Sequence, residues 1–124
     1  DPEKSRTGVM SVGVPGMVQG LWELHREHGT LPWKDLLSPA IRLASEGFEV
    51  SEILHENITK NTSRFNEAAR AIFCPGGQAL PVGSTLIQKD LANTLKVIAE
   101  NGASGFYKGE IAHLIQKILE EHIW

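Results

Sequence analysis

Two stretches carry the clearest structural signal, LPWKDLLSPAIRLASEG at residues 31–47 and QKDLANTLKVIAENG at residues 88–102. In both, apolar residues recur at the i, i+3, i+4, i+7 spacing of one helix face. Gly47 and Gly102 stand where helices usually end. Pro39 interrupts the first pattern, and because proline lacks a backbone N–H we expect a kink or a break there.

Further helices are predicted outward from these two by the same spacing and by residues that begin or end helices. In the helix expected over 15–29, Gly16 and Gly20 lie four residues apart. Each costs up to about 1 kcal/mol of helix stability relative to alanine in a helix interior. We therefore expect another element to pack closely against that face. The further helices are expected over 15–29, 51–62, 67–73 and 109–121, with a single turn over 103–107 and an irregular loop over 75–86.

One strand is predicted, over Val9–Val14, where β-branched residues precede a Pro-Gly pair. A lone strand cannot satisfy its backbone groups, so we expect it to be disordered or to pair with another copy of the chain. The preceding residues 1–8 are polar and predict a flexible lead-in. The fold class is thus mostly α, with about five helices and one short strand in a single unit, 1–124. We expect a core of Met17, Leu21, Leu36, Leu43, Leu95, Ile98, Ile111 and Ile115.

Composition is that of one soluble globular domain. The chain has 124 residues, 41% of them hydrophobic and 22% charged, and a formal net charge of −3. The absence of a basic excess argues against nucleic acid as a partner. The apolar runs are far too short to span a bilayer. The single cysteine, Cys74, cannot form an internal disulfide or a cysteine-based zinc site.

Histidines are the first candidates for chemistry. His25 and His28 are three residues apart on a predicted helix, with Glu23 and Glu27 nearby. A zinc site normally needs three or four converging ligands, and the other histidines are scattered. A solvated helix face explains this pattern better than a metal site.

Cys74 and the glycine-containing turn Gly13–Gly16 are the next candidates. A lone cysteine can be a thiol nucleophile but is more often a small buried hydrophobic residue. The turn opens a helix, as phosphate-binding loops do, but it matches neither common phosphate-loop motif, and Pro15 removes one amide donor. We interpret it as a tight turn between strand and helix.

Two sequons, Asn57-Ile58-Thr59 and Asn61-Thr62-Ser63, fit the acceptor pattern for N-glycosylation. Such a short pattern is common by chance, and it matters only in a secreted eukaryotic protein. No nucleophile elbow or paired carboxylate is evident. The residues alone therefore predict no catalytic, cofactor-binding or metal-binding residue in this chain and no cofactor.

Three stretches resemble the large subunit of γ-glutamyltranspeptidases. SVGVPGMVQGLW at 11–22 resembles the family's AVGVPGxVxGL segment, and HGTLPWKDLLSPAIRLASEGF at 28–48 resembles YGxLPWxxLxxPAIxLAxxGF. LANTL, IAENG and GFYKGEIA, between residues 91 and 112, resemble LAxTLxxIAxxGxxxFYxGxIA. The likeness runs from Val9 to about Leu119, in the family's order and spacing, and it includes Pro39 and the Gly16/Gly20 pair.

The resemblance implies an amino-terminal-nucleophile hydrolase, with a four-layer αββα parent fold. Such a precursor cleaves itself into two subunits, and the new amino-terminal Thr of the small subunit attacks γ-glutamyl amides such as glutathione. The acyl-enzyme then passes the γ-glutamyl group to an amino acid, a peptide or water. The partners implied are the rest of the large subunit, the small subunit and γ-glutamyl substrates.

The chain departs from the family pattern in what it lacks. No self-cleavage Thr segment is present, and Arg6 lacks the context of the family's substrate-binding arginine, so that role is not transferred to it. We expect an internal, helical part of a large subunit, inactive alone, in a protein that is secreted, periplasmic or on the cell surface. The alternatives are a relative acting on poly-γ-glutamate or cephalosporin side chains, and a free-standing helical interaction module.

Overall fold

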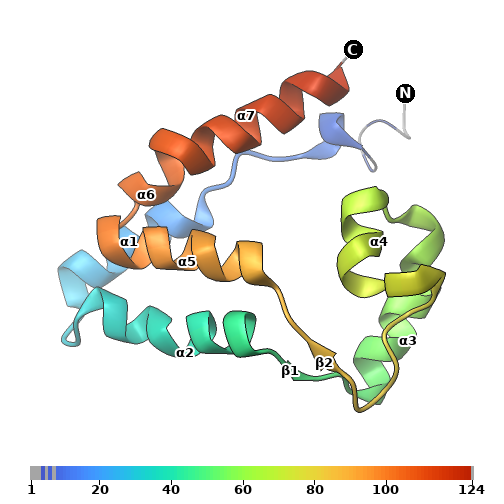
Figure 1. The fold of residues 1–124 in the computed structure, drawn as a ribbon. Helices are drawn as coiled ribbons and strands as arrows, with labels where there is room; N and C mark the ends of the chain where they lie inside the picture. Colours follow the sequence, from blue (N-terminus) through green and yellow to red (C-terminus); the bar gives the residue numbers. More distant parts are fainter. Residues whose placement is uncertain (1–3, 5, 7, 124) are drawn as a thin grey trace. The chain divides into compact units, whose positions relative to one another are not determined.

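The computed structural model describes residues 4, 6 and 8–123. Helices dominate this part of the chain (Figure 1). They form where periodic apolar residues lie between helix-ending glycines and capping side chains. The α-helices are α1 (Met17–His28), α2 (Trp33–Glu46), α3 (Glu52–Asn61), α4 (Glu67–Phe73), α5 (Lys89–Asn101), α6 (Ser104–Tyr107) and α7 (Gly109–Ile123). The short elements are the 3-10 helices η1 (Val9–Ser11), η2 (Thr62–Arg64) and η3 (Pro75–Gly77) and the strands β1 (Phe48–Glu49) and β2 (Thr85–Leu86).

The mostly α prediction is confirmed, and every expected helix is present with its ends within a few residues of those predicted. Pro39 does not break α2, which remains one helix from Trp33 to Glu46. Part of the expected loop over 75–86 is instead the turn η3 and strand β2. Two-residue strands are too short to show an alternating pattern, so the sequence did not reveal them.

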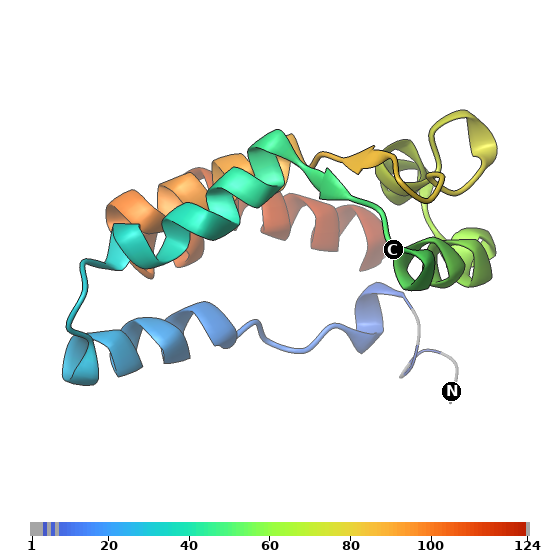
Figure 2. The ribbon, with the colours of Figure 1, turned by 90° about the horizontal axis from the view of Figure 1, so that it is seen from below.

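The strand predicted over Val9–Val14 is wrong. Its first residues form η1, in which the amide and hydroxyl of Ser11 both donate to the carbonyl of Gly8, at 3.1 and 2.7 Å. Beyond η1 the chain runs extended to α1 (Figure 2). β-Branched residues favour a strand only where a neighbouring strand accepts its hydrogen bonds, and local turn bonds form here instead. The self-association expected through this strand therefore loses its basis. Most of the predicted lead-in, 1–8, lies outside the described residues.

The chain divides into two compact units. One holds the residues up to Leu37 and those from Lys96 onward, and the other is the continuous segment Ser38–Leu95. Helices α2 and α5 each contribute to both units, because the divisions fall within them.

The discontinuous unit brings the two ends of the sequence together. α6 and η1 both contact α7, and the start of α2 meets the end of α5 where the indole Nε1–H of Trp33 donates to the carbonyl of Ile98 at 2.9 Å. Ile98 is buried, as predicted. Ile111 and Ile115 are half-buried.

The continuous unit has a small apolar cluster of its own, formed by Val50, Leu80 and Leu86 with Leu54 and Phe73 packed against it. β1 and β2 pair antiparallel beside this cluster, with Phe48 opposite Leu86. Gly47 permits the sharp entry into β1: its φ is +87°, and a Cβ there would lie 2.5 Å from the Thr85 side chain.

Several residues predicted for the core are exposed. Leu36 and Leu43 are about half exposed, and so is Leu21, while Met17 is 78% exposed. Leu95 is half-buried. The expectation that another element packs against Gly16 and Gly20 is also wrong for the described residues, since a Cβ at either glycine would meet none of their atoms within 4 Å. Of the helices described, none combines the length and the apolar character needed to cross a membrane.

Candidate functional site

Helix α1 begins at a residue that has no side chain with which to cap it. A helix leaves its first backbone N–H groups without intrahelical partners, and Gly16 provides no capping atom. The hydroxyl of Tyr107 supplies one instead, because the amide of Gln19 donates to it at 3.2 Å. The same hydroxyl donates to the carbonyl of Pro15 at 2.5 Å, across 92 residues of sequence.

This arrangement leaves the turn Gly13–Gly16 poorly equipped to bind a phosphate. Pro15 has no amide proton, and the amide of Gln19 already has an acceptor. The turn is exposed, and apart from adjacent residues no described atom lies within 4 Å of a Cβ placed at Gly13 or Gly16. The geometry favours a structural junction over an anion site.

An aromatic cluster joins α1 to the start of α2. The rings of Trp22 and Trp33 meet edge to face, with centroids 5.0 Å apart, and the ring of His25 lies 5.2 Å from that of Trp33. Nε2 of His25 lies 2.7 Å from the carbonyl oxygen of Leu31. Because a carbonyl only accepts, this nitrogen carries a proton and donates it. The cluster therefore fixes the connection between the two helices.

The histidine pair considered as metal ligands does not converge. His25 is turned into the aromatic cluster, whereas Nε2 of His28 lies 3.6 Å from a carboxylate oxygen of Glu27 on the exposed side of α1. Glu23 pairs with Arg26 at 3.3 Å. Among the side chains that the structure describes, no group of three or more potential metal ligands is close enough to hold an ion.

Cys74 is buried, with 3% of its surface exposed. Its sulfur lies 3.6 Å from the hydroxyl of Thr62, whereas the imidazole of His55 is engaged with the backbone, its Nδ1 lying 2.8 Å from the carbonyl oxygen of Leu80. A nucleophilic thiol needs access to substrate and a base within reach. Cys74 has the environment of a packed structural cysteine.

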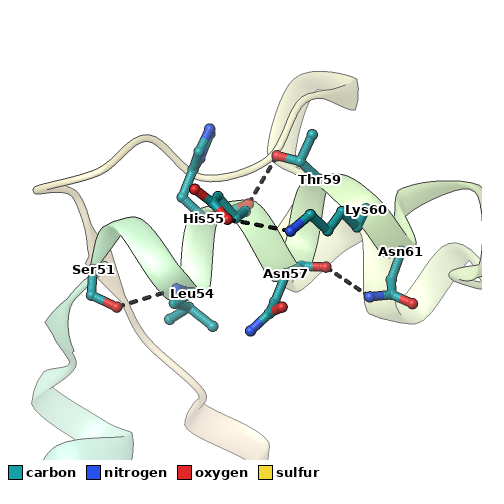
Figure 3. A network of polar contacts seen from close by, with 8 residues as sticks. Ser51, Leu54, His55, Asn57, Thr59, Lys60 and Asn61 are labelled. Carbon is teal, nitrogen blue, oxygen red and sulfur yellow. Dashed lines mark hydrogen bonds and ion pairs between the residues drawn. The ribbon is translucent and has the colours of Figure 1, made fainter.

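Both sequons lie in or beside α3, and Figure 3 shows their polar contacts. The side-chain amide of Asn61 donates to the carbonyl of Asn57 at 2.8 Å, and the hydroxyl of Thr59 donates to the carbonyl of His55 at 2.8 Å. These bonds are local helix contacts. Ser51 begins the helix, since its hydroxyl oxygen accepts from the amide of Leu54 at 3.2 Å.

The remaining candidates do not form a site. Arg6 is exposed near the beginning of the described chain. A hollow of about 480 Å³ lies at the start of α5, and Lys89 and Asp90 are among the residues that line it. Since no buried side-chain nitrogen or oxygen is left without a partner in the described part, nothing there marks a ligand position.

Comparison with known proteins identifies the family. The gamma-glutamyltranspeptidase family model matches residues 1–122. The chain is 43% identical to the capsule biosynthesis protein CapD proenzyme of Bacillus anthracis over 86% of its length, and 40% identical to the glutathione hydrolase proenzyme of Bacillus subtilis over 90%. This chain belongs to the gamma-glutamyltranspeptidase family.

Solved structures agree with this assignment. The γ-glutamyltranspeptidase of Helicobacter pylori matches 98% of the chain with a TM-score of 0.94 at 34% identity, and 36% of that structure's chain is covered. Cephalosporin acylase of Bacillus halodurans matches 92% with a TM-score of 0.84 at 33% identity, covering 23% of its chain. The chain spans about a fifth of the length of CapD and of the Bacillus subtilis proenzyme.

Two long-range contacts were missed by sequence reasoning. Tyr107 and Trp33 lie within the family-like stretches, but nothing in their spacing told us that they bond to Pro15 and Ile98. The available signal was indirect. Gly16 offers no capping side chain to α1, so the amides of the first turn were left to bond with water or with a polar group from elsewhere in the chain.

Proposed function

We propose that this chain is a helical segment of an enzyme that transfers or hydrolyses γ-glutamyl groups, and that it supports the enzyme's fold without contributing a catalytic residue. One observation supports this most. The three family-like stretches are joined by hydrogen bonds through Tyr107 and Trp33, whereas the candidate reactive groups, Cys74 and the histidines, are scattered or engaged in packing.

The reaction proposed for the whole protein is acyl transfer. A threonine hydroxyl outside these 124 residues attacks the γ-carbonyl carbon of a glutamyl amide, and the amine leaves with a proton. The resulting ester is opened by an amino acid, a peptide or water, which restores the hydroxyl. We further propose that the whole protein is secreted, periplasmic or on the cell surface, as expected for the family.

Two experiments test this proposal. Sequencing the gene on both sides of the region that encodes this chain should reveal a downstream Thr-led segment like that of the family. The intact protein should release the amine from a γ-glutamyl anilide, and replacing the leading threonine by alanine should abolish both self-cleavage and turnover. A gene without such a segment, or an intact protein that is inactive on every γ-glutamyl donor, would refute the enzymatic role.

A second candidate is an enzyme of the same family with a different amide substrate. The similarity to CapD, named for capsule biosynthesis, and to a cephalosporin acylase supports this alternative. Comparing kcat/KM of the intact protein on glutathione, poly-γ-glutamate and a glutaryl amide separates the candidates. A kcat/KM for glutathione that is tenfold or more above the others corresponds to about 1.4 kcal/mol of transition-state binding. It would favour the enzyme that acts on glutathione.

A further inference from the structure

The hydroxyl of Tyr107 occupies a specific position in the first turn of α1. In an α-helix the amide of residue i donates to the carbonyl of residue i−4, but Pro15 precedes the cap residue Gly16, so the amide of Gln19 has no acceptor within α1. Here Gln19 donates to the Tyr107 hydroxyl, which itself donates to the Pro15 carbonyl. One residue later the regular pattern begins, since Gly20 donates to Gly16 at 3.0 Å. The hydroxyl therefore bridges the Gln19 amide and the Pro15 carbonyl immediately before the first hydrogen bond of the helix ladder.

The start of α1 has little stability of its own. Gly16 stands at the cap position without a capping side chain, and the first turn contains no acidic residue to interact with the positive end of the helix dipole. Gly20 lies in the next turn, and a glycine within a helix costs up to about 1 kcal/mol relative to alanine. A helix that begins in this way depends on a contact from elsewhere in the chain.

The residue that supplies this contact is held firmly. Tyr107 ends the short helix α6, its amide donates to the carbonyl of Ala103 at 3.1 Å, and its ring meets Phe106 edge to face at 5.0 Å. α6 also lies close to α5, because a Cβ at Gly105 would be 2.5 Å from the carbonyl oxygen of Val97. The position of the hydroxyl is therefore set by α5 and α6.

We propose that the Tyr107 hydroxyl, together with the Pro15 carbonyl and the Gln19 amide, is a latch that fixes where α1 begins. While this latch is closed, the exposed segment before α1 is kept ordered by its hydrogen bond to Tyr107, and therefore by the position of α6. When the hydroxyl is absent, the Pro15 carbonyl and the Gln19 amide both hydrogen-bond to water, and the first turn of α1 frays. This inference is independent of the proposed enzymatic function, because it concerns only contacts within this chain.

Residue-resolved hydrogen exchange on the intact protein that contains this chain tests the latch. In the unaltered protein the amide of Gln19 should exchange more slowly than those of Met17 and Val18, which precede it in the first turn. Tyr107→Phe keeps the ring and removes only the hydroxyl. It should accelerate exchange at Gln19 about fivefold, the factor that corresponds to one hydrogen bond of about 1 kcal/mol, and leave Leu24–His28 unchanged.

Ser104→Ala is the matched control. It removes another hydroxyl of α6, which donates to the carbonyl of Asn101 at 2.7 Å, and leaves the latch intact. Exchange at Gln19 should not change in this variant. Three results would overturn the proposal: unchanged exchange at Gln19 in Tyr107→Phe, equal acceleration throughout α1, or the same local acceleration in Ser104→Ala.

Discussion

Gly102, at the end of α5, meets two requirements that no larger residue satisfies together. Its φ is +64°, a left-handed conformation that side chains disfavour. A Cβ at this position would also lie 2.7 Å from two ring carbons of Trp22. The glycine therefore both ends α5 and lets the α1 indole lie directly on the backbone.

We predict that Gly102→Ala destabilises the protein more than Gly109→Ala does. Gly109 has a similar φ of +71°, but a Cβ there would meet no described atom within 4 Å. Gly109→Ala should lower the free energy of unfolding by about 1–2 kcal/mol through backbone strain, and Gly102→Ala should lower it by at least about 1 kcal/mol more through the clash with Trp22. Urea denaturation of the two variants measures the difference, and equal losses would show that the contact with Trp22 contributes nothing.

Residue types at the helix ends could be predicted from sequence because their effect is local. Gly47, Gly102 and Ser51 act through φ angles and capping bonds within a few residues. The bonds of Tyr107 and Trp33 span 92 and 65 residues. Their identity depends on which helices meet, and a single sequence does not encode that in its spacing.

Among the elements, α2 is notable because it tolerates a proline in its interior. Pro39 cannot donate to the carbonyl four residues before it, and its side chain is exposed. We predict that Pro39→Ala stabilises the protein by about 2 kcal/mol, because the regained helix bond outweighs the greater flexibility of the unfolded chain.

The rise in melting temperature measures this gain, with the neighbouring Ser38→Ala as a control for helix propensity alone. A fall in melting temperature for Pro39→Ala would mean that the proline geometry is itself required by packing.

Helix α3 provides a second test at this scale. The hydroxyl of Ser51 caps its first turn (Figure 3), whereas the hydroxyl of Ser45 donates to the carbonyl of Arg42 within α2. We predict that Ser51→Ala lowers the free energy of unfolding by about 1 kcal/mol and that Ser45→Ala lowers it by less than half of that. Denaturant unfolding measures both values. Similar losses in both would contradict the capping role.

The helices were predictable because each carries its period and its end signals locally, as α5 does between Lys89 and Gly102. The segment Val9–Val14 was not, because a strand needs a partner that local sequence cannot supply. β1 and β2 escaped detection for the opposite reason: they are paired, but each is only two residues long.

At the scale of the whole molecule, the predicted core and the observed core differ in a systematic way. Met17, Leu21 and Leu24 form one apolar stripe on α1, yet all three are exposed. The stripe predicted a helix correctly, but periodicity does not say what covers a helix face. Since the chain spans about a fifth of the length of its curated relatives, we propose that other parts of the intact protein cover this stripe.

Gly20→Ala tests this proposal. In the 124-residue chain a Cβ at Gly20 meets no described atom, so the substitution should stabilise the chain by about 1 kcal/mol through helix propensity. In the intact protein the same substitution should bring no gain, because the covering segment would be displaced. The change in melting temperature caused by Gly20→Ala, measured in the 124-residue chain and in the intact protein, distinguishes these outcomes. An equal gain in both would favour a free-standing helical module.

The division of the chain into units also determines the order in which contacts become possible during synthesis. Ser38–Leu95 is continuous, so its contacts can form once residue 95 has left the ribosome. The other unit must wait, since Pro15 and Trp33 emerge long before the residues to which they bond. The residues up to Leu37 are thus synthesised before the rest of this chain, but they complete their contacts only after the residues from Lys96 onward have emerged.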